Sequence, residues 1–398
     1  MCRVNLRMNR PEKRHFFAPT FAGLRLFDVL PTLRSARVFP FDRSNTAYFY
    51  NARSAIYTLA KLWDLAGKEV LFPAYCCGVD LLAMLAAGAR PRFYPVHEGM
   101  RVDAGEVVSM IGPETKAIYL IHYFGFPGPI DELSDACRNR EVLLIEDCAL
   151  ALFSKSGNRP LGSFGDAAVF SLYKTLSVPS GGALIVNNGH ISGMSAKYAP
   201  PLISTLTHLV SLLETSWDVR NVKWGQKLTT AMRATGRKVK GSVKAEPVIE
   251  VLTDTFDPSV ARFRMSNISH WIIKRTDPET VVQARRSNYR YLDERLRQIA
   301  TTVFSDLPEG VCPLFYPVLF QDNRAAMQRL WNKGVQAWAW WWPSPALLEG
   351  HAFPEVDSLR RSVVAIPCHE GLAQESLRLL ADEVAAAIIA TGSDRRNP

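Results

Sequence analysis

The sequence predicts an α/β fold built on a mostly parallel sheet. Its 398 residues, 47% of them hydrophobic and 21% charged, suit a globular chain of about two domains with a substantial core. Helically spaced segments, such as 80–88 and 130–140, separate apolar runs that resemble strands, as in a parallel sheet covered on both faces. The predicted strands are residues 69–75, 90–96, 116–124, 141–149, 166–173 and 182–188.

This alternation of strands and helices stops near residue 189. The next stretch looks helical and irregular, and a long helix is expected over residues 277–300, ahead of a smaller mixed region. We therefore expect a large α/β domain and a small C-terminal α+β domain. The predicted parts are a basic N-terminal arm (1–45), the large domain (46–280) with a basic helical insertion at about 190–255, and the small domain (281–398).

The net charge of +9 is unevenly distributed. Residues 1–40 hold eight Lys or Arg against two acids, and residues 220–244 hold eight against none. Such clusters suit an anionic membrane, a polyphosphate-bearing substrate or a nucleic acid, and equally a solvated basic loop. No nucleic-acid-binding motif accompanies them, so we expect no nucleic-acid partner. Residues 21–39 fit either an amphipathic segment at a membrane surface or a helix packed on the core.

Other features narrow the class of protein. The sequence has no run of eighteen or more apolar residues and no apolar N-terminal segment with a small-residue cleavage site, so we expect a cytoplasmic protein. Its eight histidines lack the HExxH spacing of a zinc site, and we predict no metal. The seven cysteines lack paired CxxC spacing and predict no disulfide framework: Cys2, Cys76, Cys77, Cys137, Cys148, Cys312 and Cys368.

Two acids end one predicted strand, in the sequence IEDCA. Carboxylates there, Glu146 and Asp147, are costly to bury unless a cation or hydrogen-bond donors meet them. A cofactor ring nitrogen that must stay protonated is one such partner. The alternative is an acid that caps the following loop or helix.

The next predicted strand ends in an S-x-x-K pattern, formed by Ser171 and Lys174. In a serine hydrolase the serine would be the nucleophile and the lysine its base. In a pyridoxal phosphate enzyme of the aspartate aminotransferase fold, the lysine would form a Schiff base and the serine hydroxyl would bind the phosphate. The Ser-x-Asn and Lys-Thr-Gly elements that accompany the hydrolase pattern are absent from the sequence, which favours the second interpretation.

A third stretch, YNARSAIYTLAKLWDLAG, places Arg53, Ser54 and Ala55 at the start of an amphipathic helix. Exposed amides at a helix N-terminus, with a hydroxyl and a guanidinium nearby, form a phosphate site. An ordinary serine N-cap is the alternative.

In their order along the chain, these stretches resemble the DegT/StrS sugar aminotransferase family, whose members use pyridoxal phosphate. The resemblance covers roughly residues 45–190 and 255–390, and it includes PSGGALIVNN after the lysine and RFRMSNISHWIIKR at 262–275. It implies the three-layer fold type I of pyridoxal phosphate-dependent transferases, with a large mostly parallel sheet domain and a small α+β domain.

The resemblance also implies a role for each candidate residue. Lys174 would form the Schiff base and then move a proton as general acid and base, while Asp147 would keep the pyridinium nitrogen charged. Ser54, the Ala55 amide and Ser171 would hold the phosphate. Arg262 would reach the phosphate of a partner subunit, so a homodimer with shared active sites is expected.

Several positions depart from the family pattern. Members usually have two more residues between the serine and the lysine. Leu150 stands where a polar residue usually touches the cofactor phenolate, and Cys77 stands where an aromatic ring usually stacks on the cofactor, with Tyr75 as its neighbour. Arg262 replaces a usual asparagine. The Trp-rich stretch 336–345 is expected either to shape the substrate side of the pocket or to pack in the core.

We therefore expect a pyridoxal phosphate-dependent aminotransferase. It would convert a keto sugar, nucleotide-linked, to an amino sugar with glutamate or glutamine as the donor. One alternative is other chemistry of the same cofactor, namely dehydration or transamination of a non-sugar substrate. The other is a non-catalytic binding or regulatory protein of the same fold, held at a membrane by its basic segments.

Overall fold

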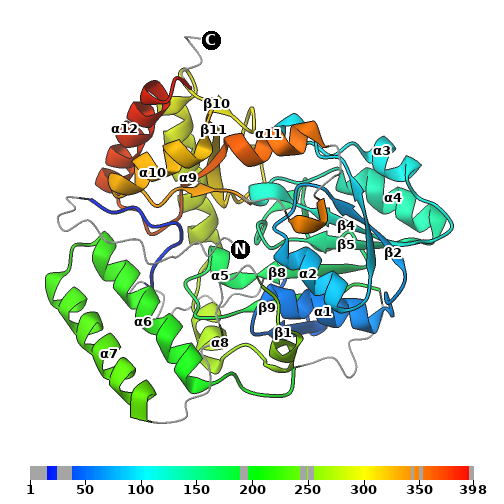
Figure 1. Cartoon of the computed structure of the whole chain (residues 1–398), viewed down its shortest axis with the longest axis horizontal. Helices are drawn as coiled ribbons and strands as arrows, with labels where there is room; N and C mark the ends of the chain where they lie inside the picture. Colours follow the sequence, from blue (N-terminus) through cyan, green and yellow to red (C-terminus); the bar gives the residue numbers. More distant parts are fainter. Residues whose placement is uncertain are drawn as a thin grey trace.

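The computed structural model describes residues 16–24, 38–188, 196–242, 249, 255–341, 345–348 and 353–393. Most of the predicted interfacial segment 21–39 and residues 342–344 of the Trp-rich stretch lie outside these ranges. Figure 1 shows two sheets, with the larger on one side of the molecule and the smaller, with its long helices, on the other. A helical hairpin projects below the smaller sheet.

The larger sheet has seven strands in the order β1-β9-β8-β5-β4-β2-β3. Only β9 runs against its neighbours, so the other six strands are parallel to one another. The predicted α/β class is confirmed. The strands are β1 (Thr46–Phe49), β2 (Glu69–Pro73), β3 (Arg90–Tyr94), β4 (Thr115–Ile121), β5 (Leu143–Asp147), β8 (Ala167–Ser171) and β9 (Gly182–Val186).

Helices between these strands pack on the sheet, as apolar helix stripes and continuous apolar strands require. Helix α1 packs on β8 and β9, α2 packs on β3, and α4 packs on β5. A short antiparallel pair, β6 (Lys155–Ser156) and β7 (Arg159–Pro160), precedes β8. The helices are α1 (Ala52–Leu62), α2 (Val79–Ala86), α3 (Ala104–Ser109), α4 (Ile130–Arg140) and the single turn α5 (Leu172–Thr175).

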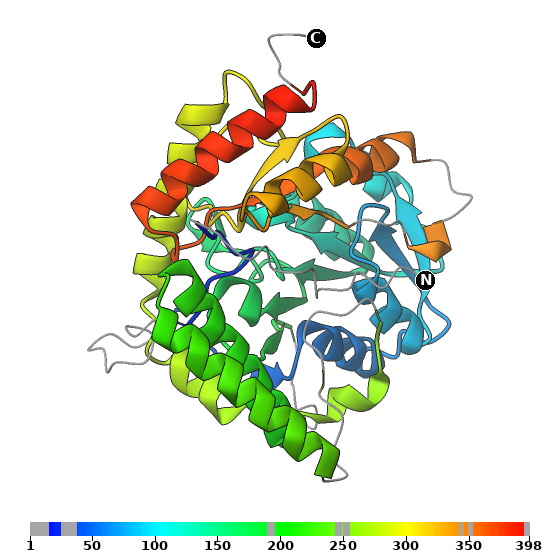
Figure 2. The same ribbon diagram turned by 60° about the vertical axis from the view of Figure 1, so that its left-hand side comes forward.

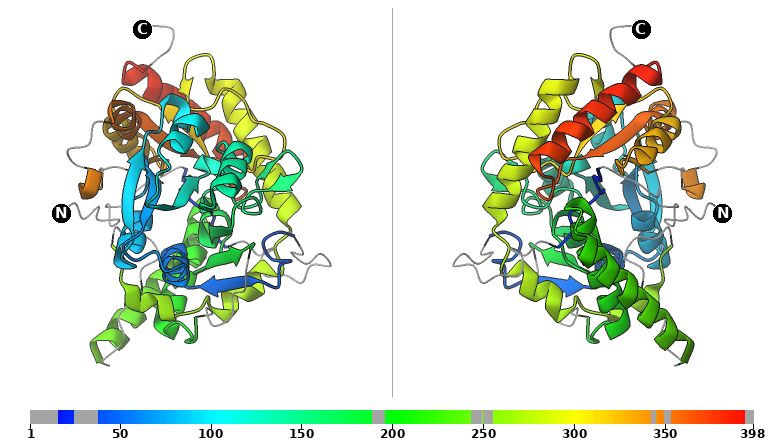
Figure 3. Two further views of the ribbon diagram at one scale, coloured as in Figure 1. Left: turned by 90° about the vertical axis from the view of Figure 1, so that its right-hand side faces the viewer. Right: turned by 90° about the vertical axis from the view of Figure 1, so that its left-hand side faces the viewer.

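The smaller sheet is antiparallel and has the order β10-β11-β13-β12. Helix α9 precedes it in sequence, and α12 follows it and packs on α9 and α10. Figure 3 shows these long helices together at one end of the molecule. The elements are α9 (Pro278–Leu296), β10 (Thr301–Thr302), β11 (Phe315–Leu319), α10 (Asn323–Asn332), β12 (Trp338–Ala339), α11 (Pro354–Ser362), β13 (Val363–Pro367) and α12 (Gln374–Ala390).

The predicted basic insertion contains an antiparallel pair of helices, α6 (Leu202–Val219) and α7 (Lys223–Ser242). Figure 2 shows this pair in front of the body of the protein. The segment around Gly23 packs directly on α6, since the Leu24 amide donates to the Leu212 carbonyl at 3.1 Å. The α8 helix (Asn267–Ile273) and the 3-10 turns η2 (Glu98–Met100), η3 (Tyr123–Gly125), η4 (Pro258–Arg262) and η5 (Ala346–Leu348) complete the described elements.

Each predicted strand of the larger sheet is present, with ends that differ by a few residues. Strand β1 and the β6-β7 pair were not predicted. They contain only four and two residues per strand, too few to show a clear periodicity, and β1 is specified by pairing with β9 over Thr46–Phe49. No helix in the described ranges is long and apolar enough to cross a membrane.

Candidate functional site

The predicted lysine and aspartate follow two adjacent parallel strands. Asp147 is the last residue of β5, and Ser171 is the last residue of β8. The two strands pair in register, with Asp147 beside Val169, so α5 and Lys174 begin just beyond the same edge of the sheet. Ligands of parallel sheets bind at this carboxyl edge.

Asp147 is buried and oriented by two donors. Its carboxylate accepts a hydrogen bond from the Tyr119 hydroxyl at 2.6 Å and another from the Ala149 amide at 2.8 Å. Burial raises the pKa of Asp147, whereas these two bonds and the charge of Lys174 oppose that rise. Among the described residues, no cation lies within 4.0 Å of this carboxylate. The carboxylate therefore retains the capacity to accept a proton-bearing cation.

Lys174 is half-buried in the α5 turn. Its Nζ lies 5.9 Å from the centre of the Trp340 ring, which comes from the smaller sheet's side of the molecule. No carboxylate of the described ranges forms an ion pair with Lys174. Its positive charge nevertheless lowers the pKa values of Asp147, Asp80 and Cys77. A lysine without an ion-pair partner beside a buried acid has the chemistry of a nucleophile or a proton carrier.

The structure adds a residue that sequence reasoning missed, Asp80. It is 5% exposed at the start of α2, and burial together with the charge of Asp147 raises its pKa from 3.8 to about 6. The sequence signal was an acid shortly after Cys77 in a predicted helix start, a position where an N-terminal helix acid is common. Cys77 is exposed, and the other five described cysteines are buried.

Ser171 carries a buried polar atom that needs a partner. The residue is 2% exposed, and its Oγ has no hydrogen bond within the described part of the chain. The Ser180 hydroxyl, in the Gly-rich turn after Lys174, is likewise buried without one. Because such groups are rare in native proteins, these two hydroxyls indicate a ligand or an ordered water.

The start of α1 differs from the sequence expectation. Asn51, not Ser54, caps the helix, since the Asn51 side chain accepts from both the Ser54 amide and the Ser54 hydroxyl at 3.0 Å. The Ser54 and Ala55 side chains are fully buried. Arg53 is 8% exposed and lies near enough to Cys77 and Tyr173 for their charges to affect its pKa, which burial lowers.

Gly182 brings this helix start close to the carboxyl edge of the sheet. A Cβ at that position would lie 2.3 Å from the carbonyl carbon and oxygen of Asn51. Only a glycine at the start of β9 permits this approach. The second glycine of the pair after Lys174 therefore permits the packing of α1 on β9.

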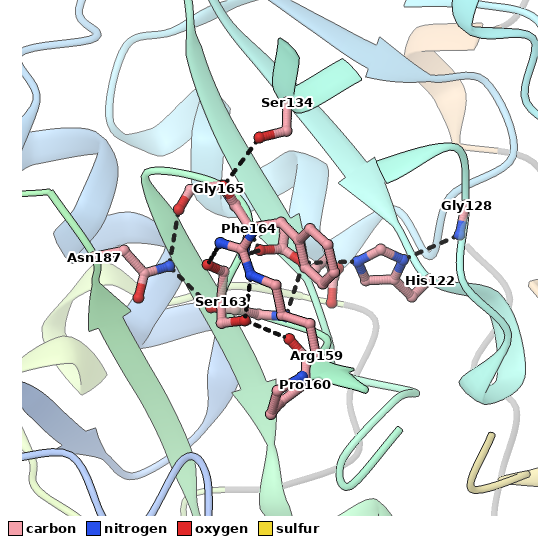
Figure 4. Close-up of polar contacts among 12 residues, drawn as sticks. His122, Gly128, Ser134, Arg159, Pro160, Ser163, Phe164, Gly165 and Asn187 are labelled. Carbon is pink, nitrogen blue, oxygen red and sulfur yellow. Dashed lines mark hydrogen bonds and ion pairs between the residues drawn. The ribbon is translucent and has the colours of Figure 1, made fainter. Parts of the chain in front are cut away.

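Glu146, the other acid of the IEDCA stretch, has four donors. Its carboxylate accepts from the Gly162, Phe164 and Gly165 amides, each at 2.7 Å, and from His122 Nε2 at 3.1 Å. His122 Nδ1 accepts from the Gly128 amide, which leaves the proton on Nε2. Figure 4 shows His122 between Gly128 and the loop that carries Phe164 and Gly165.

This arrangement assigns Glu146 to the scaffold. It fixes the loop that leads into β8 and hence the register in which Val169 lies beside Asp147. His122, Glu146 and Cys148 form the one cluster of possible metal ligands in the described ranges. Because the Glu146 oxygens and His122 Nδ1 are already engaged with protein donors, the cluster does not favour a metal.

Aromatic residues lie above the carboxyl edge. Tyr75 is fully buried, its hydroxyl donates to the Trp340 carbonyl at 3.2 Å, and its ring centre lies 5.0 Å from that of Trp341. Tyr75 therefore packs against the Trp-rich stretch and is not available to stack on a ligand in the place of Cys77. The described part of that stretch lies near Lys174 through Trp340 and against Gly78 through Pro345.

Two further predicted positions lie apart from these contacts. Arg262 is exposed at the end of η4, where its guanidinium lies 4.8 Å from the centre of the Phe263 ring. Nothing in the described ranges joins its side chain to Lys174 or Ser171 by a hydrogen bond or an ion pair. Leu150 is 2% exposed, so the polar residue expected there is replaced by a core side chain.

A buried arginine stabilises the turn that carries Lys174. Arg285 of α9 donates to the carbonyls of Thr175 at 3.1 Å and Leu314 at 3.3 Å. Its Nε lies 2.9 Å from a carboxylate oxygen of Glu370. Both side chains of the ion pair are at most 2% exposed. The pair joins α9 to the segment after β13, and the bond to the Thr175 carbonyl joins α9 to α5.

The site therefore combines a buried aspartate with a lysine that has no ion-pair partner and a serine hydroxyl that has no hydrogen bond, both within the described part of the chain. Such a set fits a ligand that offers a carbonyl group to Lys174, a protonated ring nitrogen to Asp147 and acceptor oxygens to Ser171. The fit at Ser54 and Ala55 is poorer, because the described structure leaves neither side chain exposed.

Comparison with known proteins supports the predicted resemblance. Residues 46–201 match the DegT/DnrJ/EryC1/StrS aminotransferase family. A dTDP-4-dehydro-2,3,6-trideoxy-D-glucose 4-aminotransferase of Saccharopolyspora spinosa is 28% identical over 193 residues, which span 47% of this chain and only 50% of that protein. The erythromycin biosynthesis sensory transduction protein EryC1 of Saccharopolyspora erythraea is 26% identical over 81% of this chain and 78% of its own length.

Solved structures share the fold. Helicobacter pylori PseC, an aminotransferase involved in the biosynthesis of pseudoaminic acid, matches with a TM-score of 0.67 at 17% identity, over 94% of this chain and 100% of that one. The predicted fold of the pyridoxal phosphate-dependent transferases is therefore confirmed at the level of architecture.

Proposed function

We propose that this chain, whose residues 46–201 match the DegT/DnrJ/EryC1/StrS aminotransferase family, is a pyridoxal phosphate-dependent aminotransferase. Its substrate would be a keto sugar, nucleotide-linked, and its amino donor glutamate or glutamine. The main observation behind the proposal is that Lys174 and Asp147 lie at the same edge of the larger sheet. Neither has an ion-pair partner in the described ranges. Relatives named as nucleotide-sugar aminotransferases support the substrate class.

When bound, pyridoxal phosphate supplies an aldehyde carbon and a ring that takes up electrons from the reacting centre. Asp147 would hold the proton on the ring nitrogen, and the Tyr119 hydroxyl and Ala149 amide keep its carboxylate in one orientation. In this buried position the attraction between the carboxylate and the charged nitrogen is stronger than in water. The pKa of Asp147, which burial raises, would fall once such a cation lies beside the carboxylate.

Lys174 would hold the cofactor through Nζ, and the same atom would carry a proton as general acid and base. Its long side chain on the single-turn helix α5 supplies the reach for both tasks. The Arg285 contact to the Thr175 carbonyl keeps the backbone of this turn fixed while the side chain moves. The indole of Trp340 excludes water from one side of Nζ.

Phosphate binding would fall to Ser171, with the Ser54 hydroxyl and the Ala55 amide beside it. The orphaned Ser171 hydroxyl supports this role, since a phosphate oxygen would satisfy it. Arg53, which precedes Ser54 in sequence and lies close to Cys77, supplies a positive charge. Arg262 is exposed, which suits the proposal that it contacts the phosphate of a partner subunit in a homodimer. Localisation in the cytoplasm stays a prediction.

The first test is the visible spectrum of the purified protein with added pyridoxal phosphate, before and after borohydride reduction. We expect wild type to show a Schiff-base band, and peptide mapping to find the reduced cofactor on Lys174. Lys174→Ala should lack both, and its amino transfer should fall by a factor on the order of 10³ or more. Lys116→Ala, at an exposed lysine of β4, serves as the matched control.

A second candidate, a protein of this fold without amino transfer, is favoured by the full burial of Ser54 and Ala55. Turnover assays with glutamate or glutamine and a panel of nucleotide-linked keto sugars separate the two. Multiple turnover supports the aminotransferase. A trapped cofactor without amino transfer to any keto sugar supports the second candidate, and no cofactor band at all contradicts the catalytic proposal.

A further inference from the structure

The α6-α7 hairpin has no part in the proposed chemistry, yet its surface is unusual. Figure 1 shows α7 as the outermost element at the lower edge of the molecule, with α6 between it and the body. In Figure 3 its free end extends beyond the rest of the fold. In the first half of α7, Lys223, Lys227 and Thr230 are exposed.

Helix α7 carries an exposed apolar stripe. Trp224 is 67% exposed, Leu228 46% and Met232 42%. Their spacing of four residues aligns them along one side of the helix, because residues i and i+4 are neighbours on its surface. Single exposed apolar residues are common, but three in a row on one helix indicate a surface that is covered in use.

Another side of α7 is already packed on α6. Gly225 lies so close to the Trp217 ring that a Cβ there would be 2.3 Å from it, and Thr229 is fully buried. The stripe consequently borders the face that holds the hairpin together, and it is not the buried part of that face. The Trp224 ring packs against the Trp217 ring of α6, with ring centres 5.4 Å apart. This contact fixes the orientation of the Trp224 side chain.

Positive charge flanks the stripe. Lys223 and Lys227 are exposed next to Trp224 and Leu228 in sequence, and they line an open recess with Asn221, Gln226 and Thr230. Residues 220–244 contain eight Lys or Arg and no acid. Charge complementarity therefore requires an anionic partner. A symmetric pairing of two α7 stripes would instead bring like charges together.

We propose that α7 binds the anionic lipid surface of a membrane, lying in the plane of the headgroups. Trp224, Leu228 and Met232 would enter the boundary between headgroups and acyl chains, and the lysines would contact lipid phosphates. A basic helix with an apolar stripe and an exposed tryptophan has the composition of an interfacial helix. The proposal concerns location and is independent of the reaction, so its failure leaves the proposed function unaffected.

The test is co-sedimentation of the full chain, loaded with pyridoxal phosphate, with vesicles of phosphatidylcholine containing one fifth phosphatidylglycerol. We expect binding to these vesicles and little binding to pure phosphatidylcholine. Binding should weaken as salt is raised, because the headgroup attraction is screened. The double variants Trp224→Ala/Leu228→Ala and Lys223→Gln/Lys227→Gln should each bind about tenfold more weakly.

Matched controls use exposed residues outside the hairpin. Trp271→Ala removes another exposed tryptophan, from α8, and Lys116→Gln/Lys333→Gln removes the same charge as the lysine pair in α7. Both controls should bind as wild type does. Failure of wild type to bind the anionic vesicles overturns the proposal, and so does equal binding by the α7 variants. A concentration-dependent dimer that the Trp224→Ala/Leu228→Ala variant abolishes, without lipid binding, would identify a second copy of the chain as the occupant instead.

Discussion

Glu146 and Asp147 are consecutive acids at the end of one strand, yet their surroundings differ completely. Glu146 accepts four hydrogen bonds from groups that lie on one side of the sheet. Asp147 accepts two, and Ser171 and Lys174 follow at the same edge of the sheet. Within the described ranges Lys174 has no ion-pair partner and the Ser171 hydroxyl has no hydrogen bond. Successive side chains of a strand point to opposite faces, so one acid faces the loop before β8 and the other faces the site.

The difference between the two acids shows how residues that hold the structure can be distinguished from residues that bind a ligand. Where every polar atom is satisfied from within the chain, the network holds structure. Where buried polar groups stay unsatisfied, the chain bears an energetic cost that a ligand relieves. Substitutions should accordingly affect stability around Glu146 and ligand binding or catalysis around Asp147.

The largest effect on activity in this comparison is expected from Asp147→Asn. The amide cannot hold the proton of a ring nitrogen, so amino transfer should fall by a factor on the order of 10² to 10⁴. Unfolding by urea should show equal or slightly higher stability, because a desolvated charge has been removed. Asp131→Asn, an exposed position of α4, should change neither quantity. Activity close to wild type would remove Asp147 from the site.

Glu146→Gln should show the opposite behaviour. One carboxylate oxygen becomes an amide nitrogen that faces backbone N–H groups, so the free energy of unfolding should drop by about 2 to 4 kcal/mol. Urea titration followed by circular dichroism measures this, with exposed Glu132→Gln as the control. The cofactor should still attach to Lys174 in the molecules that remain folded. A variant as stable as wild type would contradict the assignment of Glu146 to the scaffold.

Asp80 offers a test through pH. Its folded pKa of about 6 lies above the ordinary value of 3.8, so the folded state binds the proton more tightly than the unfolded state does. Stability from this group is therefore greatest below pH 4 and decreases as pH rises from about 4 through about 6. Asp80→Asn should remove that decrease and stabilise the protein by about 1 to 3 kcal/mol at pH 7.5. Parallel stability curves for wild type and the variant between pH 4 and 7.5 would exclude this role.

The smallest effect is expected from Ser171→Ala. Its hydroxyl makes no hydrogen bond in the described structure, so the variant should unfold within about 0.5 kcal/mol of wild type. Its affinity for pyridoxal phosphate should fall by about tenfold, the value of one hydrogen bond to a charged group. Equilibrium titration of the visible band measures the affinity. A loss of stability with unchanged affinity for pyridoxal phosphate would show that Ser171 stabilises the fold and does not bind the cofactor.

The sequence by itself determined the regular elements and the type of chemistry. Apolar runs and helical spacing are local patterns, so they predicted all the parallel strands beyond β1, together with α1, α2, α4 and α9. The order of the motifs predicted the family and placed Lys174 and Asp147 at strand ends. The charge count also singled out residues 220–244, since it requires no coordinates.

Tertiary structure decided which groups meet, because contacts between distant segments leave no periodic trace in the sequence. It separated Glu146 from Asp147 by giving the former donors from residues 162–165, and it placed Asp80 near Lys174. It also buried Tyr75 against Trp341. Finally, it left Trp224 exposed on α7. Burial and hydrogen bonding depend on the packing of the whole chain, and for that reason only the folded molecule distinguishes the scaffold from the site.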